Sequence, residues 1–126
     1  NEAATVNMVV NVFSKADNPT DDSIIVREIF NPAHELLVTK IHKKTHPFFL
    51  VEGEMSILTE DGVVCVKAPH NGITLAGTKR VIYANEESIF VNIHKNPTNS
   101  QDIEFLEKEI VAKDFKEYEE YINQNK

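Results

Sequence analysis

Short apolar runs separated by turn residues make up the chain from Met8 to His94, and this pattern most limits what the sequence can fold into. The runs are rich in β-branched residues and end at Gly, Pro, Asn or Asp, which is typical of β-strands. Asp61-Gly62 is the clearest turn, because this pair tolerates the positive φ angles of a tight hairpin. Strands at this spacing indicate a closed sandwich or barrel rather than alternating strands and helices.

The pattern defines the expected elements and one domain overall. The predicted strands cover residues 9–13, 23–30, 35–42, 48–51, 55–59, 63–67, 72–75, 81–84 and 88–94. Two short helices follow, one capped by a box of Thr98 and Gln101, the other by Asp114 and Glu117. We divide the chain into an N-terminal strand and loop (1–22), a barrel (23–96) and a helical tail (97–126) that packs on the barrel or on a partner.

Length and composition favour a single soluble domain of ordinary type. With 126 residues, 41% hydrophobic and 26% charged, the chain can bury one core. No apolar run approaches the ~20 residues needed to span a bilayer. The segment from Asn1 to Asn7 lacks a signal-peptide pattern, and the lone Cys65 fits a reducing compartment. We therefore expect a cytoplasmic protein without a membrane partner.

Charge is unevenly distributed. The net charge of −7 argues against binding a nucleic-acid polymer, which needs a basic footprint. Acidic residues crowd between Asp102 and Glu120, whereas the stretch from Lys40 to His46 holds three lysines, two histidines and no acid. The global charge therefore says little about a local site.

Two segments carry a resemblance to a known family. The first is Lys40-Ile41-His42-Lys43-Lys44-Thr45-His46, followed by six residues and Gly53; the second is Gly72, then Leu75-Ala76-Gly77-Thr78-Lys79-Arg80 and Ala84. With the order of strands around them, they resemble the two motifs of the cupin superfamily over roughly residues 24 to 94. The resemblance implies a mainly β fold, a single cupin (double-stranded β-helix or jelly-roll) barrel with short C-terminal helices.

The resemblance also implies a metal site, from which this sequence departs. Lys40, His42, His46 and Arg80 stand where typical cupins have the two histidines, the glutamate and the last histidine that bind one transition metal. Only His42 keeps the family's residue, although His46 can still ligate as a neutral imidazole. A unit charge ~4 Å from a divalent ion costs on the order of 8 kcal/mol at an effective dielectric of about 20. We therefore expect no cofactor. The alternative is one divalent metal (Fe, Mn, Ni or Zn) at His42 and His46.

The same positions favour an anion in the barrel. Arg80 can hold a phosphate or carboxylate by two parallel hydrogen bonds, and Lys40 adds a point charge. Phe48 supplies an apolar wall. The candidate ligand-binding residues, which include two histidines as hydrogen-bond donors or residual metal ligands, are Lys40, His42, His46, Phe48, Lys79 and Arg80.

Other interpretations of individual residues remain open. Arg80 could instead form an ion pair with Glu52 or Glu54 at the barrel rim. Three other histidines, His34, His70 and His94, are interpreted as surface or packing residues, with a late-strand ligand at His94 as the alternative.

Three classes of function follow. The first is a non-enzymatic module that binds a small anionic molecule of nucleotide or sugar-phosphate type. The segments His46-Pro47-Phe48, Lys67-Ala68-Pro69 and Gly77-Thr78-Lys79-Arg80 resemble small cupins of bacteriophages, which suggests a phage protein that sequesters a host nucleotide signal in the host cytoplasm.

The second class is a metal-dependent dioxygenase, isomerase or lyase that uses His42 and His46, with Glu35 or Glu52 as the carboxylate. The third is a structural or interaction protein with a filled barrel, whose acidic, aromatic tail contacts a partner. Under all three we expect a homodimer, because a strand edge near the N-terminus would be exposed.

Overall fold

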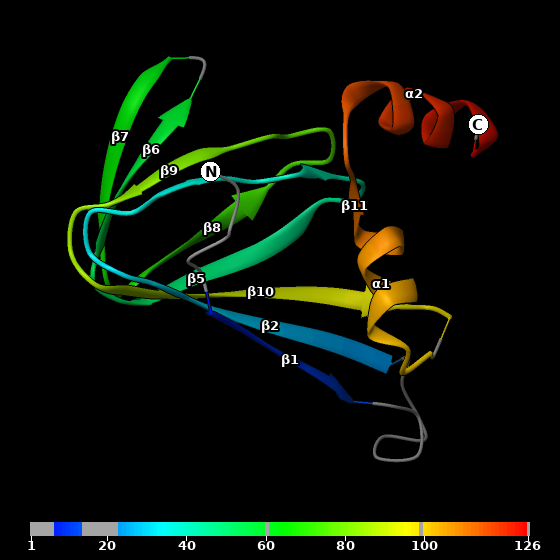
Figure 1. Ribbon diagram of the computed structural model, residues 1–126, viewed down its shortest axis with the longest axis horizontal. Helices are drawn as coiled ribbons and strands as arrows, with labels where there is room; N and C mark the ends of the chain where they lie inside the picture. Colours follow the sequence, from blue (N-terminus) through cyan, green and yellow to red (C-terminus); the bar gives the residue numbers. More distant parts are fainter. Residues whose placement is uncertain (1–6, 14–22, 60, 99, 126) are drawn as a thin grey trace.

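The computed structural model describes residues 7–13, 23–59, 61–98 and 100–125. It is a β-barrel with two short helices after it (Figure 1). The strands are β1 (Asn7–Phe13), β2 (Ser23–Asn31), β3 (Leu36–Val38), β4 (Ile41–His42), β5 (His46–Glu52), β6 (Glu54–Thr59), β7 (Gly62–Lys67), β8 (His70–Thr74), β9 (Val81–Ala84), β10 (Ser88–Asn96) and β11 (Val111–Ala112), and the helices are α1 (Ile103–Ile110) and α2 (Phe115–Gln124).

Two antiparallel sheets form the barrel. The larger has the strand order β1-β2-β10-β5-β8 and the smaller β3-β9-β6-β7, while β4 and β11 form a separate pair. The helices lie at one end, and the β6–β7 hairpin projects at the other (Figure 1). None of the helices in the described ranges has the length and apolar character to cross a membrane.

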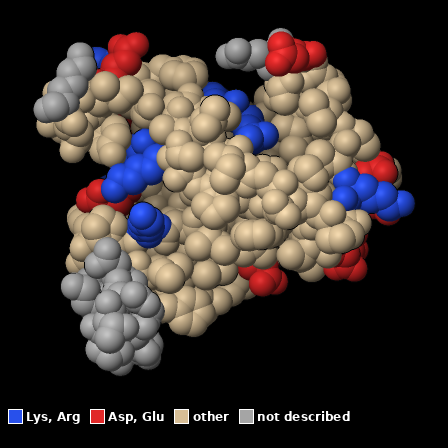
Figure 2. Space-filling view, turned by 180° about the vertical axis from the view of Figure 1, so that it is seen from behind, with Lys and Arg blue, Asp and Glu red and all other residues tan. Residues whose placement is uncertain are grey.

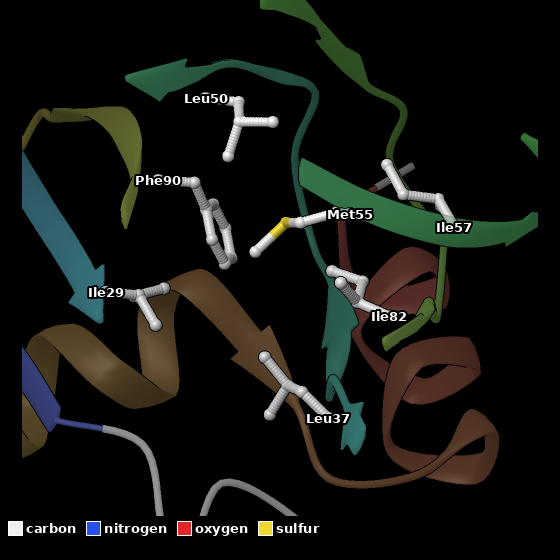
Figure 3. Packing of buried hydrophobic residues seen from close by; sticks show 7 residues of the cluster. All are labelled: Ile29, Leu37, Leu50, Met55, Ile57, Ile82 and Phe90. Carbon is white, nitrogen blue, oxygen red and sulfur yellow. The ribbon is translucent and has the colours of Figure 1, made fainter. Parts of the chain in front are cut away.

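The hydrophobic core lies between the two sheets. Its buried side chains come from both, because the inward positions alternate along each strand. They point toward one another in Figure 3, and they are Ile29, Leu37, Leu50, Met55, Ile57, Ile82 and Phe90. A second cluster fixes α1 to the barrel, since Leu106 and Ile110 pack with Ile25 and Val111.

The predicted strands agree with the structure to within two residues at each end, with one exception. The prediction of a continuous strand over 35–42 is wrong, because it is divided at Thr39 and Lys40. The first part, β3, pairs with β9, whereas β4 pairs with β11. Because the chain changes its pairing partner here, the hydrogen bonds to β9 end before those to β11 begin, and the strand is interrupted. The pair β4–β11 was not predicted.

One of the two predicted helix caps is wrong. The N-cap of α1 is Asp102, whose side chain accepts hydrogen bonds from the N–H groups of Glu104 and Phe105. Thr98 lies five residues before the first residue of the helix, and its hydroxyl oxygen accepts a hydrogen bond from the N–H of Ser100 instead. The second cap is confirmed: Asp114 Oδ1 accepts from the N–H of Glu117 at 2.8 Å and begins α2.

The outer face of the larger sheet is unusually apolar. Burial alternates along β2 and β10, and the positions that point away from the core are mostly hydrophobic. They are Ile24, Val26, Phe30, Ile89, Val91 and Ile93, with Phe49 and Val51 on the neighbouring β5. Figure 2 shows one side of the molecule, on which a broad area without Lys, Arg, Asp or Glu lies between charged groups. An antiparallel sheet that faces water normally carries polar residues at these positions.

Candidate functional site

The barrel contains a cavity of about 350 Å³ that lies next to the core and is open to solvent on one side. Much of its wall is apolar and consists of core side chains such as Ile29, Ile82 and Phe90. Four charged side chains also line it, namely Arg27, Lys40, Arg80 and Glu107. An apolar cavity with a few polar groups is the usual form of a small-molecule site.

Arg27 is the most deeply buried of these charges. It occupies an inward position of β2, between Ile25 and Ile29, and is 7% exposed. Its Nη1 lies 3.7 Å from Glu107 Oε2, and its Nε is buried without a hydrogen-bond partner. Burial lowers the pKa of Arg27 from its usual value, and the charge of Glu107 opposes this shift. A guanidinium stays protonated in proteins, so a cation faces the cavity.

Arg80 enters the cavity from the segment before β9. Its backbone exchanges hydrogen bonds with Thr39, because the Arg80 N–H donates to Thr39 Oγ1 and the Thr39 N–H donates to the Arg80 carbonyl. The guanidinium donates to the Ile73 carbonyl at 3.3 Å and lies 5.4 Å from the centroid of the Phe48 ring. Its Nε is buried without a partner, and burial lowers its pKa.

The ion pair of Arg80 with Glu52 or Glu54, the alternative interpretation, does not occur among the described residues. Glu54 Oε2 instead accepts a hydrogen bond from Asn85 at 3.0 Å. Arg80 is therefore held by a carbonyl and an aromatic ring, which leaves its charge without a carboxylate partner in the described part of the chain.

Three buried histidines form a row that begins at the cavity, which His42 lines, and continues into the barrel through His46 and His94. The ring centroids of His42 and His46 lie 4.7 Å apart, and those of His46 and His94 lie 4.3 Å apart. His42 Nδ1 donates to the Thr78 carbonyl and His46 Nδ1 to the Pro47 carbonyl. A neutral imidazole has only one N–H, so the Nε2 atoms of His42 and His46 are acceptors and not donors.

The row is held neutral. Burial lowers the pKa of His42 to about 4, with further contributions from His46, Arg27 and Arg80. Burial lowers the pKa of His94 to about 2, and the charge of Arg27 adds to this shift. Burial also lowers the pKa of His46, although its bond to Pro47 opposes the shift. Near neutral pH the row therefore adds no positive charge to the site.

The metal that the fold family implies does not fit this donor set. Among the described residues there is no group of three or more His, Cys, Asp or Glu side chains placed to hold a metal ion. Of the four positions to which the resemblance assigns ligands, Lys40 and Arg80 bring cations instead.

The structure brings most of the candidate residues together. Lys40, His42, Phe48 and Arg80 all line the cavity. His46 is buried beside His42 but lines a second hollow of about 220 Å³, together with His94. Lys79 lines neither of these two hollows.

Three important residues were missing from the sequence-based site: Arg27, Glu107 and His94, the last of which was interpreted as a surface or packing residue, with a late-strand ligand as the alternative. Neither Arg27 nor His94 carries a signal in the sequence alone, because β2 and β10 have apolar residues at both alternating sets of positions, and only the structure shows that these two side chains face inward. A buried position for a charged residue is unusual enough to mark a site. Glu107 carries no signal in the sequence either, since only the docking of α1 on the barrel brings it to the cavity.

Comparisons with known proteins identify the fold. No family model matches the sequence, and no curated protein matches it. A cupin superfamily protein from Desulfitobacterium hafniense matches with a TM-score of 0.54 at 10% identity, over 71% of this chain and 77% of that one. The cupin domain of an XRE family transcriptional regulator from Enterobacter cloacae matches with a TM-score of 0.51 at 11% identity, over 68% and 93%.

The EutQ protein of Clostridium difficile is also similar, with a TM-score of 0.50 at 10% identity over 71% of this chain and 68% of that one. At these identities the likeness shows the fold. The chain has the cupin jelly-roll fold, as its motifs predicted.

Proposed function

We propose that this protein binds a small anionic molecule of the nucleotide or sugar-phosphate type in the barrel cavity, without transforming it. One observation carries the proposal: Arg27 and Arg80 line a single cavity, and the Nε of each is buried without a hydrogen-bond partner. An unsatisfied buried donor costs roughly 1–3 kcal/mol. The Nε atoms themselves are closed to solvent, but a phosphate oxygen in the cavity can accept hydrogen bonds from the two guanidinium groups and neutralise the cations.

The apolar wall supports a ligand with a second, less polar part. Phe48 and Phe90 line the same cavity as the cations. The volume of about 350 Å³ lies at the lower end of the range for small-molecule sites, which begins near ~300 Å³. The cavity also argues against the third class of function, in which side chains fill the barrel.

Binding without catalysis is the simpler assignment for this set of groups. A general base works best when its pKa lies near the operating pH. The pKa of His42 is lowered to about 4, which leaves it a weak base. The metal-dependent alternative lacks a fitting donor set among the described residues.

The resemblance to small bacteriophage cupins gives the proposal a biological setting. In that setting the protein sequesters a host nucleotide signal in the host cytoplasm. Mass spectrometry of gently denatured protein, purified from cells and also after soaking with nucleotides, tests this version. A nucleotide released in stoichiometric amount would support it, and its absence under both conditions would refute it.

The binding proposal itself is tested by an Arg80→Ala variant. We expect ligand binding, measured by calorimetry with the molecule identified by mass spectrometry, to be lost while the circular dichroism spectrum is unchanged. Arg80 makes no ion pair among the described residues, so its removal leaves no buried carboxylate unpaired. Lys67→Ala, which removes a cation at the end of β7 away from the cavity lining, is the matched control. Unchanged binding in Arg80→Ala would contradict the proposal.

A further inference from the structure

Glu107 of α1 joins two of the cavity's cations. Its Oε2 lies 3.7 Å from Arg27 Nη1, and its Oε1 lies 3.6 Å from Lys40 Nζ. These are the two ion pairs found among the described residues, and both end on this one carboxylate. Glu107 is also the only acidic residue that lines the cavity in the described part of the chain. A carboxylate therefore already stands beside Arg27, one of the two arginines that the proposed ligand would contact.

The backbone of α1 is fixed on the barrel, but the side chain of Glu107 is free to rotate. Leu106 and Ile110 are buried and pack against Ile25 and Val111, which fixes the backbone of α1 on the barrel. The Glu107 side chain, in contrast, is 35% exposed. Rotation about its side-chain bonds would move the carboxylate into solvent without moving the helix.

We infer that Glu107 is an internal counterion which the ligand displaces, and that this exchange selects ligands with at least two negative charges; the inference rests on the proposed function. Three cations and one carboxylate line the cavity, which leaves an excess of positive charge. A ligand with one negative charge that replaces Glu107 exchanges one anion for another and gains little. A dianion gains the attraction of the additional charge. The expected ligand class is therefore a phosphate monoester rather than a carboxylate or sulfate ester.

Two probes of nearly the same shape separate these classes. Phenyl phosphate is a dianion at pH 8, because the second pKa of a phosphate ester is about 6. Phenyl sulfate has the same ring and a tetrahedral head group but only one negative charge. We expect calorimetric titration of the unaltered protein to show clear binding of phenyl phosphate and much weaker binding of phenyl sulfate. Equal affinity for the two would overturn the charge selection.

The Glu107→Gln variant tests displacement. It removes the competing charge with little change of volume, so both probes should bind more tightly by a similar factor, about tenfold or more. Glu109→Gln, two residues along the same helix and outside the lining of this cavity, should change neither affinity. Unchanged or weaker binding in Glu107→Gln would overturn the inference. A gain confined to phenyl phosphate would also overturn it, because Glu107 would then stay in place and merely repel.

A second variant guards against a folding failure, and the unaltered protein tests the proposed function separately. If Glu107→Gln fails to fold by circular dichroism, Glu107→Asp replaces it: the shorter side chain keeps the charge but reaches the cations less well, so tighter binding is again expected, and its absence overturns the inference. If neither the unaltered protein nor a folded variant binds phenyl phosphate at millimolar concentration, the proposed function fails as well. Binding by the unaltered protein without any effect of residue 107 overturns the inference alone.

Discussion

The imidazole rings of His46 and His94 lie in contact inside the barrel, with centroids 4.3 Å apart and an interplanar angle of 51°. Neither Nε2 atom has a hydrogen-bond partner among the described residues, and both are buried. His42 extends the row, and the positive charge of Arg27 helps to lower the pKa of all three histidines. The arrangement tolerates neutral imidazoles and opposes their protonation.

The row makes the protein sensitive to acid. A folded-state pKa below the unfolded value of 6.5 means that the unfolded chain binds more protons, so stability rises with pH. Stability is fully present above about pH 6.5 and is lost as the pH falls through the folded pKa values of about 4 for His42 and about 2 for His94. Each histidine contributes up to about 1.4 kcal/mol per pH unit to the loss.

Urea unfolding between pH 8 and pH 5 measures this slope. His94→Gln should reduce it by about the contribution of one proton, whereas His34→Gln, at a residue outside the row, should leave it unchanged. A free energy of unfolding that does not vary from pH 7 to pH 5 would contradict the prediction.

Gly53, between β5 and β6, should not accept a side chain. Its φ is +92°, and an added Cβ would lie 2.8 Å from Ser88 Cα and would also clash with the carbonyl of Glu87. We expect Gly53→Ala to lower the free energy of unfolding by about 2–4 kcal/mol, since strain and overpacking add. Gly62→Ala is the matched control: its φ of +112° is also positive, but the space around it is open. Thermal unfolding of both variants should show the larger loss at position 53.

Metal analysis of protein purified without a histidine tag should find far less than one transition-metal ion per chain. The reason is electrostatic, because Arg80 and Lys40 line the cavity in which a divalent ion would sit. Inductively coupled plasma mass spectrometry, before and after dialysis against Fe(II), Mn(II), Ni(II) and Zn(II), measures the content. One ion per chain that survives dialysis would revive the enzyme hypothesis at His42 and His46.

The apolar outer face of the larger sheet should bind a second copy of the chain. Val91 lies near its middle, since it pairs with both Glu28 and Phe49 on the flanking strands. Apolar patches this broad mark interaction surfaces, and closed twofold dimers are the commonest soluble oligomers. Sedimentation analysis should therefore show a dimer, and Val91→Glu should convert it to a monomer. Val63→Glu, on the exposed β7 strand, should remain dimeric. A monomer before any substitution would refute the expectation.

Local sequence signals predicted most of the fold. The hairpin at Asp61-Gly62 and the cap at Asp114 are both properties of neighbouring residues, and each agrees with the structure. The division of 35–42 into β3 and β4 depends on β11, which comes much later in the chain. Pairing between distant segments leaves no local pattern in either one.

The candidate site was predictable to a similar degree. The cupin motifs placed Lys40, His42 and Arg80, strand alternation suggested Phe48, and all four line one cavity. Arg27 was not readable from the sequence, because β2 has apolar residues on both faces and only the structure shows which face is inward. Glu107 was not readable either, because the acidic residues around it on α1 look alike in sequence, and the docking of the helix decides which one meets Arg27.

The pairing of β4 with β11 determines when the site can exist during synthesis. Val111 pairs with His42 and lines the cavity, although most of the barrel lies between the two residues in the chain. During synthesis the strands of both sheets therefore leave the ribosome before the segment that completes the wall beside His42. Closing so long a loop is slow, and the contact forms late. In a nascent chain the two sheets would therefore form before the cavity wall beside His42 is complete.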